Sequence, residues 1–514
     1  MFGLALLLLP LLLSSFPTSI FAAPKEDKVH SLPDYGIPAK SMYSGFLDAT
    51  EGTYLHYWFA EGPSPEAPVV LWLNGGPGSS SILGFLQEMG PILMNNTGGI
   101  MNNPYAWTNR AHLIALESPA GVGYSYCPTY PICDNTDTST AKDARRALQD
   151  FFKKFPELAK NEFFITGESY AGVYVPTLAQ EILQNAPDIR LVGIAAGDPC
   201  TDTDFQKESM NMLWYAHKHG LVPDDDFDFL WNKCGDSVRQ STKKFITKGR
   251  WIRENGRWAD ELLADASAPP STECTLAQRK YLLTTSKGIA QGWDGAYINE
   301  LDFYADAAAL DWDLPGTLNY FQSQYLRRDD VKKALHVESA PSASHPWPGP
   351  PDGWTYTSEY NACNDRPSIN ESMVDIYRRI APKLEKGAYV FNGDTDPCVS
   401  YEGTRNAIEA VGFPVLEGGA YRPWFYNKTA TTFELLTEKP NLFGPTLDVH
   451  PGGAQFGGQI VNYENGLSFL TVHGSGHMVP QFQPQAADRG ALTCPNCSST
   501  NRSCSSPSHD HRPV

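Results

Sequence analysis

The stretch FFITGESYAG, residues 163–172, places a serine where a short apolar run gives way to a helix-like run. Ser169 stands on the predicted turn between Gly167 and Gly172, whose missing side chains leave the backbone room. A strand, a sharp turn and a helix is the arrangement that lifts a serine hydroxyl clear of a sheet for nucleophilic attack. The usual pattern has glycine two residues after the serine, where this chain has Ala171. A purely structural turn is therefore the alternative unless other segments supply the remaining chemistry.

A serine hydroxyl is a weak nucleophile, so it needs a base, and the base needs an acid to orient it. His477 lies in the glycine-rich stretch VHGSGHMVP after an apolar run, with His473 as the competing imidazole. Asp394 and Asp396 lie in NGDTDPC, also directly after an apolar run. The chain order serine, aspartate, histidine is that of the α/β-hydrolases. The three stretches together therefore predict acyl-transfer chemistry at Ser169.

Acyl transfer passes through an oxyanion, which needs hydrogen-bond donors. The stretch WLNGGPGSSS follows an early apolar run and offers the backbone N–H groups of Gly75 and Gly76. The residue after the nucleophile, Tyr170, is the second expected donor. Read alone, the glycines form a tight turn, so their role depends on whether that turn faces Ser169.

Strands and helices are expected to alternate along the chain. Short apolar runs predict buried strands at 68–74, 112–117, 163–166, 191–197, 388–393 and 467–472. Apolar residues at helical spacing predict helices at 138–155 and 170–185. Pro176 predicts a kink or an irregular first turn in the second helix. This alternation predicts an α/β-hydrolase fold, with a mostly parallel central sheet and helices on both faces.

The alternation stops between residues 200 and 320, which contain an acidic run and three cysteines. We expect residues 23–199 and 321–495 to form the core, with 200–320 inserted as a cap over the site. A separate domain without a catalytic part is the alternative for this insertion. Residues 496–514 are expected to form a polar tail.

The first residues of the chain predict a secretory signal peptide at 1–22, although the usual basic residue near the start is missing. A short membrane anchor is the alternative, but Pro10 and then serine and threonine interrupt the apolar run. No later segment has the length of a transmembrane helix, so stable membrane insertion is not expected. The net charge of −18, without a basic block, argues against nucleic acid and anionic membranes as partners.

Ten cysteines follow the signal, and an even number in a secreted chain favours disulfides. Cys127 and Cys133 flank a short loop that a disulfide would close. The tail CPNCSSTNRSCSSPSHDH lacks the regular spacing of zinc ligands, so disulfides are expected there and no metal. Five glycosylation sequons agree with passage through the secretory pathway, at Asn95, Asn370, Asn427, Asn496 and Asn501.

Four segments, WLNGGPGSSS, GESYAGVYVP, NGDTDPCVS and GSGHMVP, resemble the signature segments of the serine carboxypeptidase family, in that family's order over residues 71–480. The PGSSS form is most similar to the fungal carboxypeptidase S1 branch. The resemblance implies that Ser169 is the nucleophile, His477 the base and Asp396, rather than Asp394, the acid. It implies no cofactor and no metal.

The resemblance also implies an oxyanion hole at Gly76 and Tyr170, and a site for the substrate's terminal carboxylate at Asn74, Gly75, Glu88 and Glu168. If the two glutamates lie close together, burial and repulsion raise their pKa values. Once protonated, they donate hydrogen bonds to the carboxylate, and binding weakens as the pH rises. We therefore expect an acidic pH optimum. Without the resemblance, Glu88 reads as an ordinary carboxylate on a helix surface.

Most members of the family have a disulfide-bonded cysteine where Ser79 stands, so that bridge cannot form and the pairing of the other cysteines is open. The chain is expected to be a secreted or, alternatively, vacuolar glycoprotein that hydrolyses C-terminal residues from peptides and proteins with a free C-terminus. An acyltransferase on the same scaffold is the nearest alternative. A catalytically inactive secreted binding glycoprotein is a third, which the intact triad argues against. No oligomeric state is predicted.

Overall fold

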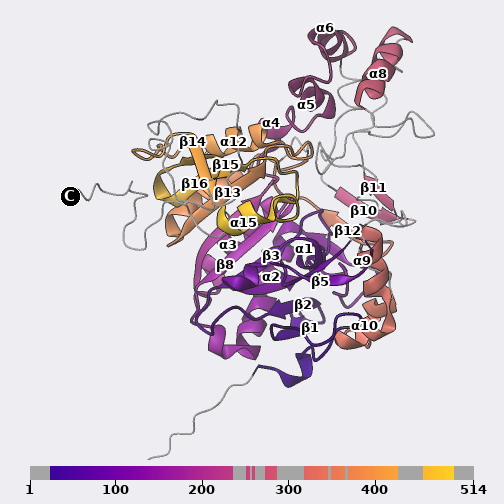
Figure 1. Cartoon of the computed structure of the whole chain (residues 1–514), viewed down its shortest axis with the longest axis vertical. Coiled ribbons are helices and arrows are strands. Elements are labelled where there is room, and N and C mark those ends of the chain that lie inside the picture. Colours follow the sequence, from indigo (N-terminus) through magenta and orange to yellow (C-terminus); the bar gives the residue numbers. More distant parts are fainter. Residues whose placement is uncertain are drawn as a thin grey trace, which may run out of the picture.

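The computed structural model describes residues 23–95, 97–235, 250–254, 257–260, 272–285, 318–344, 349–364, 369–426 and 455–490. The strands of the main sheet are β1 (Met42–Asp48), β2 (Tyr54–Ala60), β3 (Val69–Leu73), β6 (His112–Leu116), β8 (Phe163–Glu168), β9 (Leu191–Gly197), β13 (Gly387–Gly393), β14 (Arg422–Tyr426), β15 (Gln455–Asn462) and β16 (Leu467–Val472). They form a ten-stranded sheet in the order β1-β2-β6-β3-β8-β9-β13-β16-β15-β14 (Figure 1).

The middle of this sheet is parallel. Neighbours from β6 through β3, β8, β9 and β13 to β16 all pair in parallel. The strands β1 and β2 extend one side of the sheet antiparallel, and β15 and β14 extend the other. The six predicted strands are these six parallel ones, within one or two residues at each end. The predicted mostly parallel sheet is confirmed, and the fold is that of an α/β-hydrolase.

Helices cover both faces of the sheet. On one face the main helices are α2 (Asp137–Lys154), α3 (Ala171–Asn185) and α11 (Met373–Ile380), and on the other they are α1 (Ile82–Gln87), α9 (Leu318–Arg327) and α10 (Asp329–Ala334). Side chains of β3 alternate between two apolar cores, because successive residues of a strand point to opposite faces. Leu71 packs in the core that contains Leu148 of α2, whereas Trp72 packs in the core that contains Phe85 of α1. The sheet therefore carries buried residues on both sides.

The two predicted helices are confirmed as α2 and α3. Thr136 caps α2 by accepting a hydrogen bond from the backbone of Ser139, which bonds back to it. α3 continues through Pro176. At its start the N–H of Gly172 bonds to the carbonyl three residues earlier, at Ser169, as is common at the beginning of helices.

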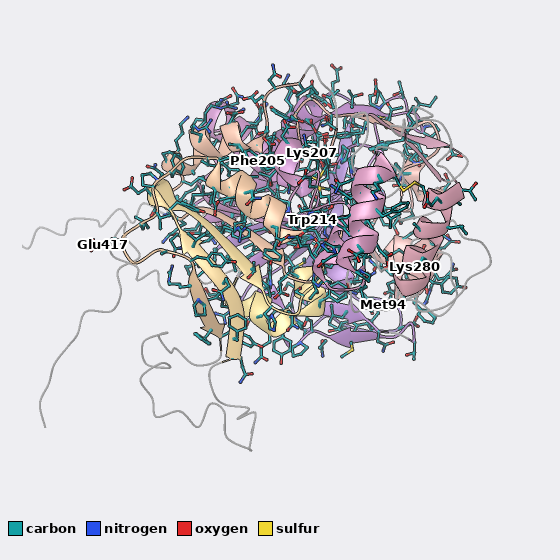
Figure 2. The ribbon with its side chains drawn as sticks, turned by 90° about the horizontal axis from the view of Figure 1, so that it is seen from above. Met94, Phe205, Lys207, Trp214, Lys280 and Glu417 are labelled. Atoms are coloured by element: carbon teal, nitrogen blue, oxygen red, sulfur yellow. A yellow bond between two sulfur atoms is a disulfide. The ribbon has the colours of Figure 1, made fainter. Side chains whose placement is uncertain are left out.

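The segment between β9 and α9 has its own small elements, α4 (Thr203–Gln206), α5 (Met212–Lys218), α6 (Asp224–Asp228), β10 (Arg250–Glu254), β11 (Arg257–Asp260) and α8 (Thr272–Thr285). α5, α6 and α8 lie together at the top of the view, away from the main sheet (Figure 1). Leu213 and Leu230 belong to a small apolar core of this segment. Figure 2 shows the molecule from above, with Phe205, Trp214 and Lys280 of the segment labelled. That the segment acts as a cap stays a prediction, as do the other domain limits.

Shorter elements complete the described chain. β7 (Asp134–Thr136) and β12 (Thr355–Thr357) join β10 and β11 in a four-stranded sheet, and β4 (Ile92–Met94) pairs with β5 (Ile100–Asn102). The helices that follow later strands are α12 (Tyr401–Glu409), α14 (Val479–Phe482) and α15 (Pro484–Gly490). No helix within the described ranges has both the length and the hydrophobicity to cross a membrane. The predicted signal peptide and polar tail lie outside these ranges.

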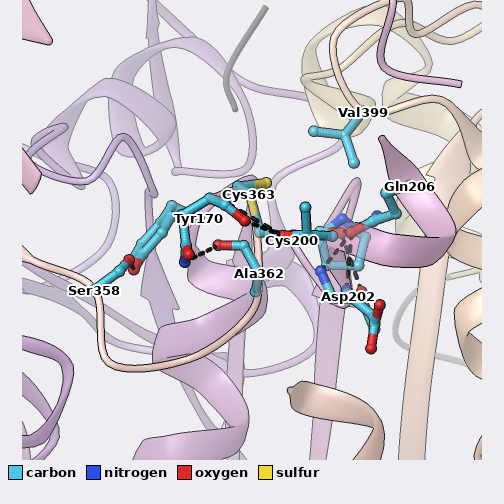
Figure 3. The surroundings of a disulfide bond; sticks show 12 residues. Tyr170, Cys200, Asp202, Gln206, Ser358, Ala362, Cys363 and Val399 are labelled. Atoms are coloured by element: carbon cyan, nitrogen blue, oxygen red, sulfur yellow. Dashed lines mark hydrogen bonds between the residues drawn. A yellow bond between two sulfur atoms is a disulfide. The ribbon is translucent and has the colours of Figure 1, made fainter. Parts of the chain in front are cut away.

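Disulfides join Cys127 to Cys133, Cys200 to Cys363, and Cys234 to Cys274. The first closes the short loop that the sequence indicated. The second joins the residues after β9 to the loop after β12, and it lies between Tyr170 and Gln206 in Figure 3.

Three disulfides agree with the expectation that an even number of cysteines favours disulfides, and the remaining pairing stays open. Cys398 is buried, and its sulfur lies within 4.8 Å of ligand atoms of Asp396 and His477. The tail cysteines, Cys494, Cys497 and Cys504, lie outside the described residues.

Candidate active site

Ser169 occupies a strained turn between β8 and α3. Its φ is +65°, a left-handed conformation that is uncommon for residues other than glycine and typical of strained functional turns. Three backbone hydrogen bonds hold it there. Its N–H donates to Gly197 at 2.9 Å, and its carbonyl accepts from Gly172 at 2.8 Å and Cys200 at 3.0 Å. Ser169 is partly exposed, so the turn leaves this residue accessible at the end of β8, where the predicted nucleophile is expected.

The glycines around Ser169 are explained by close packing rather than by flexibility. A Cβ on Gly167 would lie 2.3 Å from the carbonyl oxygen of Leu73 on the neighbouring strand. A Cβ on Gly172 would lie 2.5 Å from the carbonyl oxygen of Cys200. Real Cβ atoms do not approach so closely, so both positions require glycine for the sharp turn to form.

His477 and Asp396 form a buried pair. His477 follows β16 and Asp396 follows β13, and the atoms Nδ1 and Oδ2 lie 2.8 Å apart. The Asp396 carboxylate also accepts hydrogen bonds from the backbone N–H of Cys398 at 2.7 Å and of Val399 at 3.2 Å. A proton on Nδ1 that faces Asp396 leaves Nε2 as the basic nitrogen. Because β8, β13 and β16 are parallel, the loops that carry these groups and Ser169 all leave the same edge of the sheet.

Asp394 and His473 form a second, exposed pair. Their Oδ2 and Nδ1 atoms lie 2.7 Å apart, and the side chains are 25% and 59% exposed. Asp394 also accepts a hydrogen bond from the N–H of Gly474 at 2.7 Å. It thereby joins the loop after β13 to the loop after β16. Asp396, and not Asp394, contacts His477.

The glycine turn after β3 faces the turn that carries Ser169. A Cβ on Gly75 would lie 2.3 Å from the backbone N of Tyr170 and 2.7 Å from the carbonyl oxygen of Glu168. Gly76 has a φ of +108°, which side chains rarely permit. The backbone of this turn therefore lies beside the N–H of Tyr170, as an oxyanion hole at Gly76 and Tyr170 requires.

The side chain of Tyr170 is anchored behind this turn. Its hydroxyl donates to Asp137 at 2.9 Å and contacts Ser358, and Figure 3 shows Tyr170 and Ser358 beside the disulfide. Asp137 also accepts hydrogen bonds from the hydroxyl of Tyr356 and the N–H of Glu359, each at 2.6 Å. Burial raises the pKa of Asp137 to about 6, although its hydrogen bonds oppose this. Sequence reasoning missed Asp137, whose one signal is its place at the start of a helix.

The predicted carboxylate-binding residues lie together. Asn74 donates from Nδ2 to Glu168 Oε1 at 2.8 Å and, at 3.5 Å, to Glu88 Oε1. Its own Oδ1 accepts from the indole N–H of Trp72 at 2.9 Å and the N–H of Gly84 at 3.1 Å. These two donors fix the amide so that its NH₂ group points at the glutamates.

Glu88 and Glu168 form a buried, coupled pair. They are 2% and 4% exposed and in hydrogen-bond contact with each other, so the alternative of a surface position for Glu88 is wrong. Burial raises the pKa of Glu88 to about 7. Burial and the nearby Glu88 raise the pKa of Glu168. Within the described part of the chain no N–H or O–H group donates a hydrogen bond to either Oε2.

One group near the site has metal-ligating side chains. Oxygen, sulfur and nitrogen atoms of Asp396, Cys398 and His477 lie within 4.8 Å of one another. The carboxylate of Asp396 is already bound by two backbone N–H groups and by the imidazole. We therefore assign no metal to this group.

The sequons fall in different parts of the chain. Asn95 is partly exposed in a turn, where its Oδ1 accepts hydrogen bonds from the hydroxyl and N–H of Thr97. Asn370 is exposed. The sequons at Asn427, Asn496 and Asn501 lie outside the described residues. Glycosylation at all five stays a prediction.

Known proteins resemble this chain over nearly its whole length. A family model described as serine carboxypeptidase matches residues 33–490. The Lysosomal protective protein of Mus musculus is 31% identical over 504 residues, covering 93% of this chain and 96% of the mouse protein. Serine carboxypeptidase 24 of Arabidopsis thaliana is 30% identical over 496 residues, covering 94% of this chain and 95% of the plant protein.

A solved structure shares the fold. The crystal structure of Kex1(delta)p, a prohormone-processing carboxypeptidase from Saccharomyces cerevisiae, superposes with a TM-score of 0.62 at 19% identity. The match covers 91% of this chain and 95% of the yeast chain. The particular similarity to the fungal carboxypeptidase S1 branch stays a prediction. By its motifs and by these matches over nearly its whole length, the chain belongs to the serine carboxypeptidase family of hydrolytic enzymes.

Proposed function

We propose that this enzyme hydrolyses the last peptide bond of peptides and proteins with a free C-terminus, using Ser169, His477 and Asp396 as its triad. The observation that carries the proposal is the buried pair Glu88 and Glu168, which Asn74 holds by hydrogen bonds to both carboxyl groups. Glu168 directly precedes Ser169 in the chain. In the proposal, the residues that bind the terminal carboxylate therefore adjoin the residue that attacks the carbonyl.

The chemical steps follow from the hydrogen bonds. Nε2 of His477 takes the proton of the Ser169 hydroxyl as its oxygen attacks the scissile carbonyl. The N–H groups of Gly76 and Tyr170 bind the oxyanion that forms. His477 then gives the proton to the leaving amine, so the C-terminal amino acid departs and an acyl-enzyme remains. Water, deprotonated by the same imidazole, hydrolyses the ester and frees Ser169.

Recognition of the substrate depends on a proton held by the glutamate pair. When protonated, Glu88 and Glu168 donate hydrogen bonds to the terminal carboxylate, and Asn74 and the N–H of Gly75 add further donors. Because the pKa of Glu88 is raised to about 7, the pair retains a proton in acidic solution and loses it as the pH rises. Three carboxylates would then repel one another. The enzyme is accordingly proposed to work best at acidic pH.

The proposed location is the secretory pathway, ending outside the cell or, alternatively, in a vacuole or lysosome. Three disulfides support an oxidising compartment. The mouse relative is named Lysosomal protective protein. The proposal includes removal of residues 1–22 and glycosylation at the five sequons.

The test uses an N-blocked dipeptide with a free carboxylate and the same dipeptide with a C-terminal amide. At acidic pH the enzyme is expected to release free amino acid from the first and to act far more slowly on the second. The Ser169→Ala variant should release none, and an organophosphate reagent should label the wild type alone. Equal rates on the two substrates would overturn the recognition of a terminal carboxylate.

Two further outcomes separate the alternatives. Transfer of the acyl group to an added alcohol or amine in preference to water would identify an acyltransferase. Failure of the organophosphate to label Ser169 would instead identify an inactive binding protein.

A further inference from the structure

A second acidic side chain, Asp198, lies next to Asp396 of the buried pair His477 and Asp396. It follows β9 directly, next to β13 in the sheet, and it is 0% exposed. Its φ is +44°, and its N–H donates to the carbonyl of Phe391 at 2.7 Å. The carboxyl group is therefore held in a defined position in the interior.

The two oxygens of Asp198 have different surroundings. Oδ1 accepts hydrogen bonds from the side-chain amide of Asn392 and from the N–H of Gly393, both at 2.9 Å. Oδ2 is buried and has no hydrogen-bond partner of its own among the described residues. The carboxyl groups of Asp198 and Asp396 lie next to each other, close enough for a proton on one to be donated to the other. Two ionised carboxylates in this contact would repel each other, so one proton must lie between them.

The proton belongs on Asp198 rather than on Asp396. Asp396 accepts hydrogen bonds from two backbone N–H groups and from His477, all of which favour its ionised form. Asp198 has both N–H donors on Oδ1, which leaves Oδ2 to carry the proton. Burial and the charge of Asp396 raise the pKa of Asp198 well above its ordinary value, and the nearby Glu168 raises it further. The charged groups that face Asp198 are thus Asp396 and Glu168, with His477 beyond Asp396.

We propose that Asp198 is a positioning residue, which holds a proton on Oδ2 and donates it as a hydrogen bond to Asp396. This bond gives the Asp396 carboxylate a further donor beside the N–H groups of Cys398 and Val399. Asp396 is thereby held in the position in which it orients His477. The consequence for catalysis rests on the proposed function, whereas the shared proton itself does not.

Two variants separate the donor role from mere packing. Asp198→Asn has nearly the same shape, tolerates a positive φ and never ionises. Its Oδ1 can accept from Asn392 and Gly393 while its NH₂ group donates to Asp396. Asp198→Ala removes the donor. Asp198→Asn is therefore expected to keep kcat/KM within about threefold of the wild type at acidic pH.

Asp198→Ala is expected to move the acidic limb of the kcat/KM profile to higher pH by about one unit, a loss of about tenfold at the acidic end. KM for the peptide should change little, because the carboxylate-binding residues are untouched. If Asp198→Asn loses as much activity as Asp198→Ala, or if neither variant moves the acidic limb, the donor role is overturned.

Stability measurements test the proton without any assay of activity. A carboxyl group whose folded pKa is raised costs the wild type stability as the pH rises from the unfolded pKa, about 3.9, toward the folded one. Asp198→Asn lacks this cost. As the pH rises from about 4 toward neutrality, Asp198→Asn should therefore become more stable relative to the wild type, measured as the difference between their free energies of unfolding.

A difference in unfolding free energy that does not change with pH would show that Asp198 holds no proton, and would overturn the proposal. If the curves diverge as expected but the wild type releases no amino acid from any peptide, the shared proton is supported and the proposed function fails. The glutamate pair is present in both proteins, so its own pH dependence cancels in the comparison.

Discussion

The imidazole of His477 lies 2.8 Å from the carboxylate of Asp396, and both side chains are almost fully buried, at 5% and 0% exposure. Only a few residues away, His473 and Asp394 lie at almost the same separation but in contact with solvent. Interactions between charges are weaker where water screens them. The buried pair is thus the one able to stabilise an imidazolium strongly during catalysis, although both pairs have the same residue types.

This contrast predicts unequal effects of two matched substitutions. Asp396→Asn should lower kcat on the blocked dipeptide by about 10⁴-fold, because the imidazole loses the acceptor that fixes its tautomer. Asp394→Asn should lower it by less than about tenfold, since it weakens only an exposed link between two loops. Steady-state kinetics on both variants check the prediction. A loss at Asp394 as large as that at Asp396 would contradict the assignment of the acid.

A second prediction concerns the glutamate pair. The pKa of Glu88 is raised to about 7, so in the wild type KM for a peptide with a free carboxylate should rise as the pH passes through neutrality. Glu88→Gln keeps an N–H donor at every pH, and its KM should therefore rise less steeply. Glu88→Ala should raise KM already in acid. The measurement is KM as a function of pH for the three proteins.

The amide of the same dipeptide serves as the control substrate. It carries no terminal charge, so ionisation of Glu88 and Glu168 should affect its KM much less. An equally steep rise for the amide would place the pH dependence elsewhere, for example in His477.

The sequence contained enough to predict the parallel centre of the sheet and the loops of the site. β3 is a continuous apolar run and β8, β13 and β16 are largely apolar, because both faces of a central parallel strand are covered by helices. The catalytic candidates follow directly where these runs end. That is why Ser169, Asp396 and His477 could be named from local patterns.

Features that depend on long-range contacts could not be named in this way. β1 and β2 flank the parallel centre antiparallel, and their place was not evident without the sheet order. Cys200 and Cys363 are 163 residues apart, and ten cysteines permit many pairings. Asp198 follows a predicted strand just as Asp396 does, but its role depends on a carboxylate far along the chain.

A third prediction concerns Gly75. In Gly75→Ala the new Cβ would lie 2.3 Å from the backbone N of Tyr170, so the turn must move away from Ser169. We expect kcat to fall at least about 100-fold, the scale of losing an oxyanion-hole donor. Gly418→Ala is the matched control, because Gly418 has a φ of +71° with nothing within 4 Å of a new Cβ. That variant should keep full activity and lose about 1 kcal/mol of stability. Normal kcat in Gly75→Ala would show that the turn does not need this close approach.

The last prediction compares two disulfides. Cys200–Cys363 closes a loop of 163 residues, whereas Cys127–Cys133 closes one of only 6. A disulfide restricts the unfolded chain more strongly when it closes a longer loop. Replacing the two cysteines of the first bridge by serine should therefore lower the free energy of unfolding by about 5 kcal/mol, and replacing those of the second by about 2 kcal/mol. Urea unfolding of the two double variants measures the difference.

Because the N–H of Cys200 also donates to the carbonyl of Ser169, loss of the longer bridge loosens the turn that carries the nucleophile. We therefore expect activity to fall at urea concentrations below the unfolding transition in that variant alone, and parallel loss of activity and fold would show that the bridge acts on stability only.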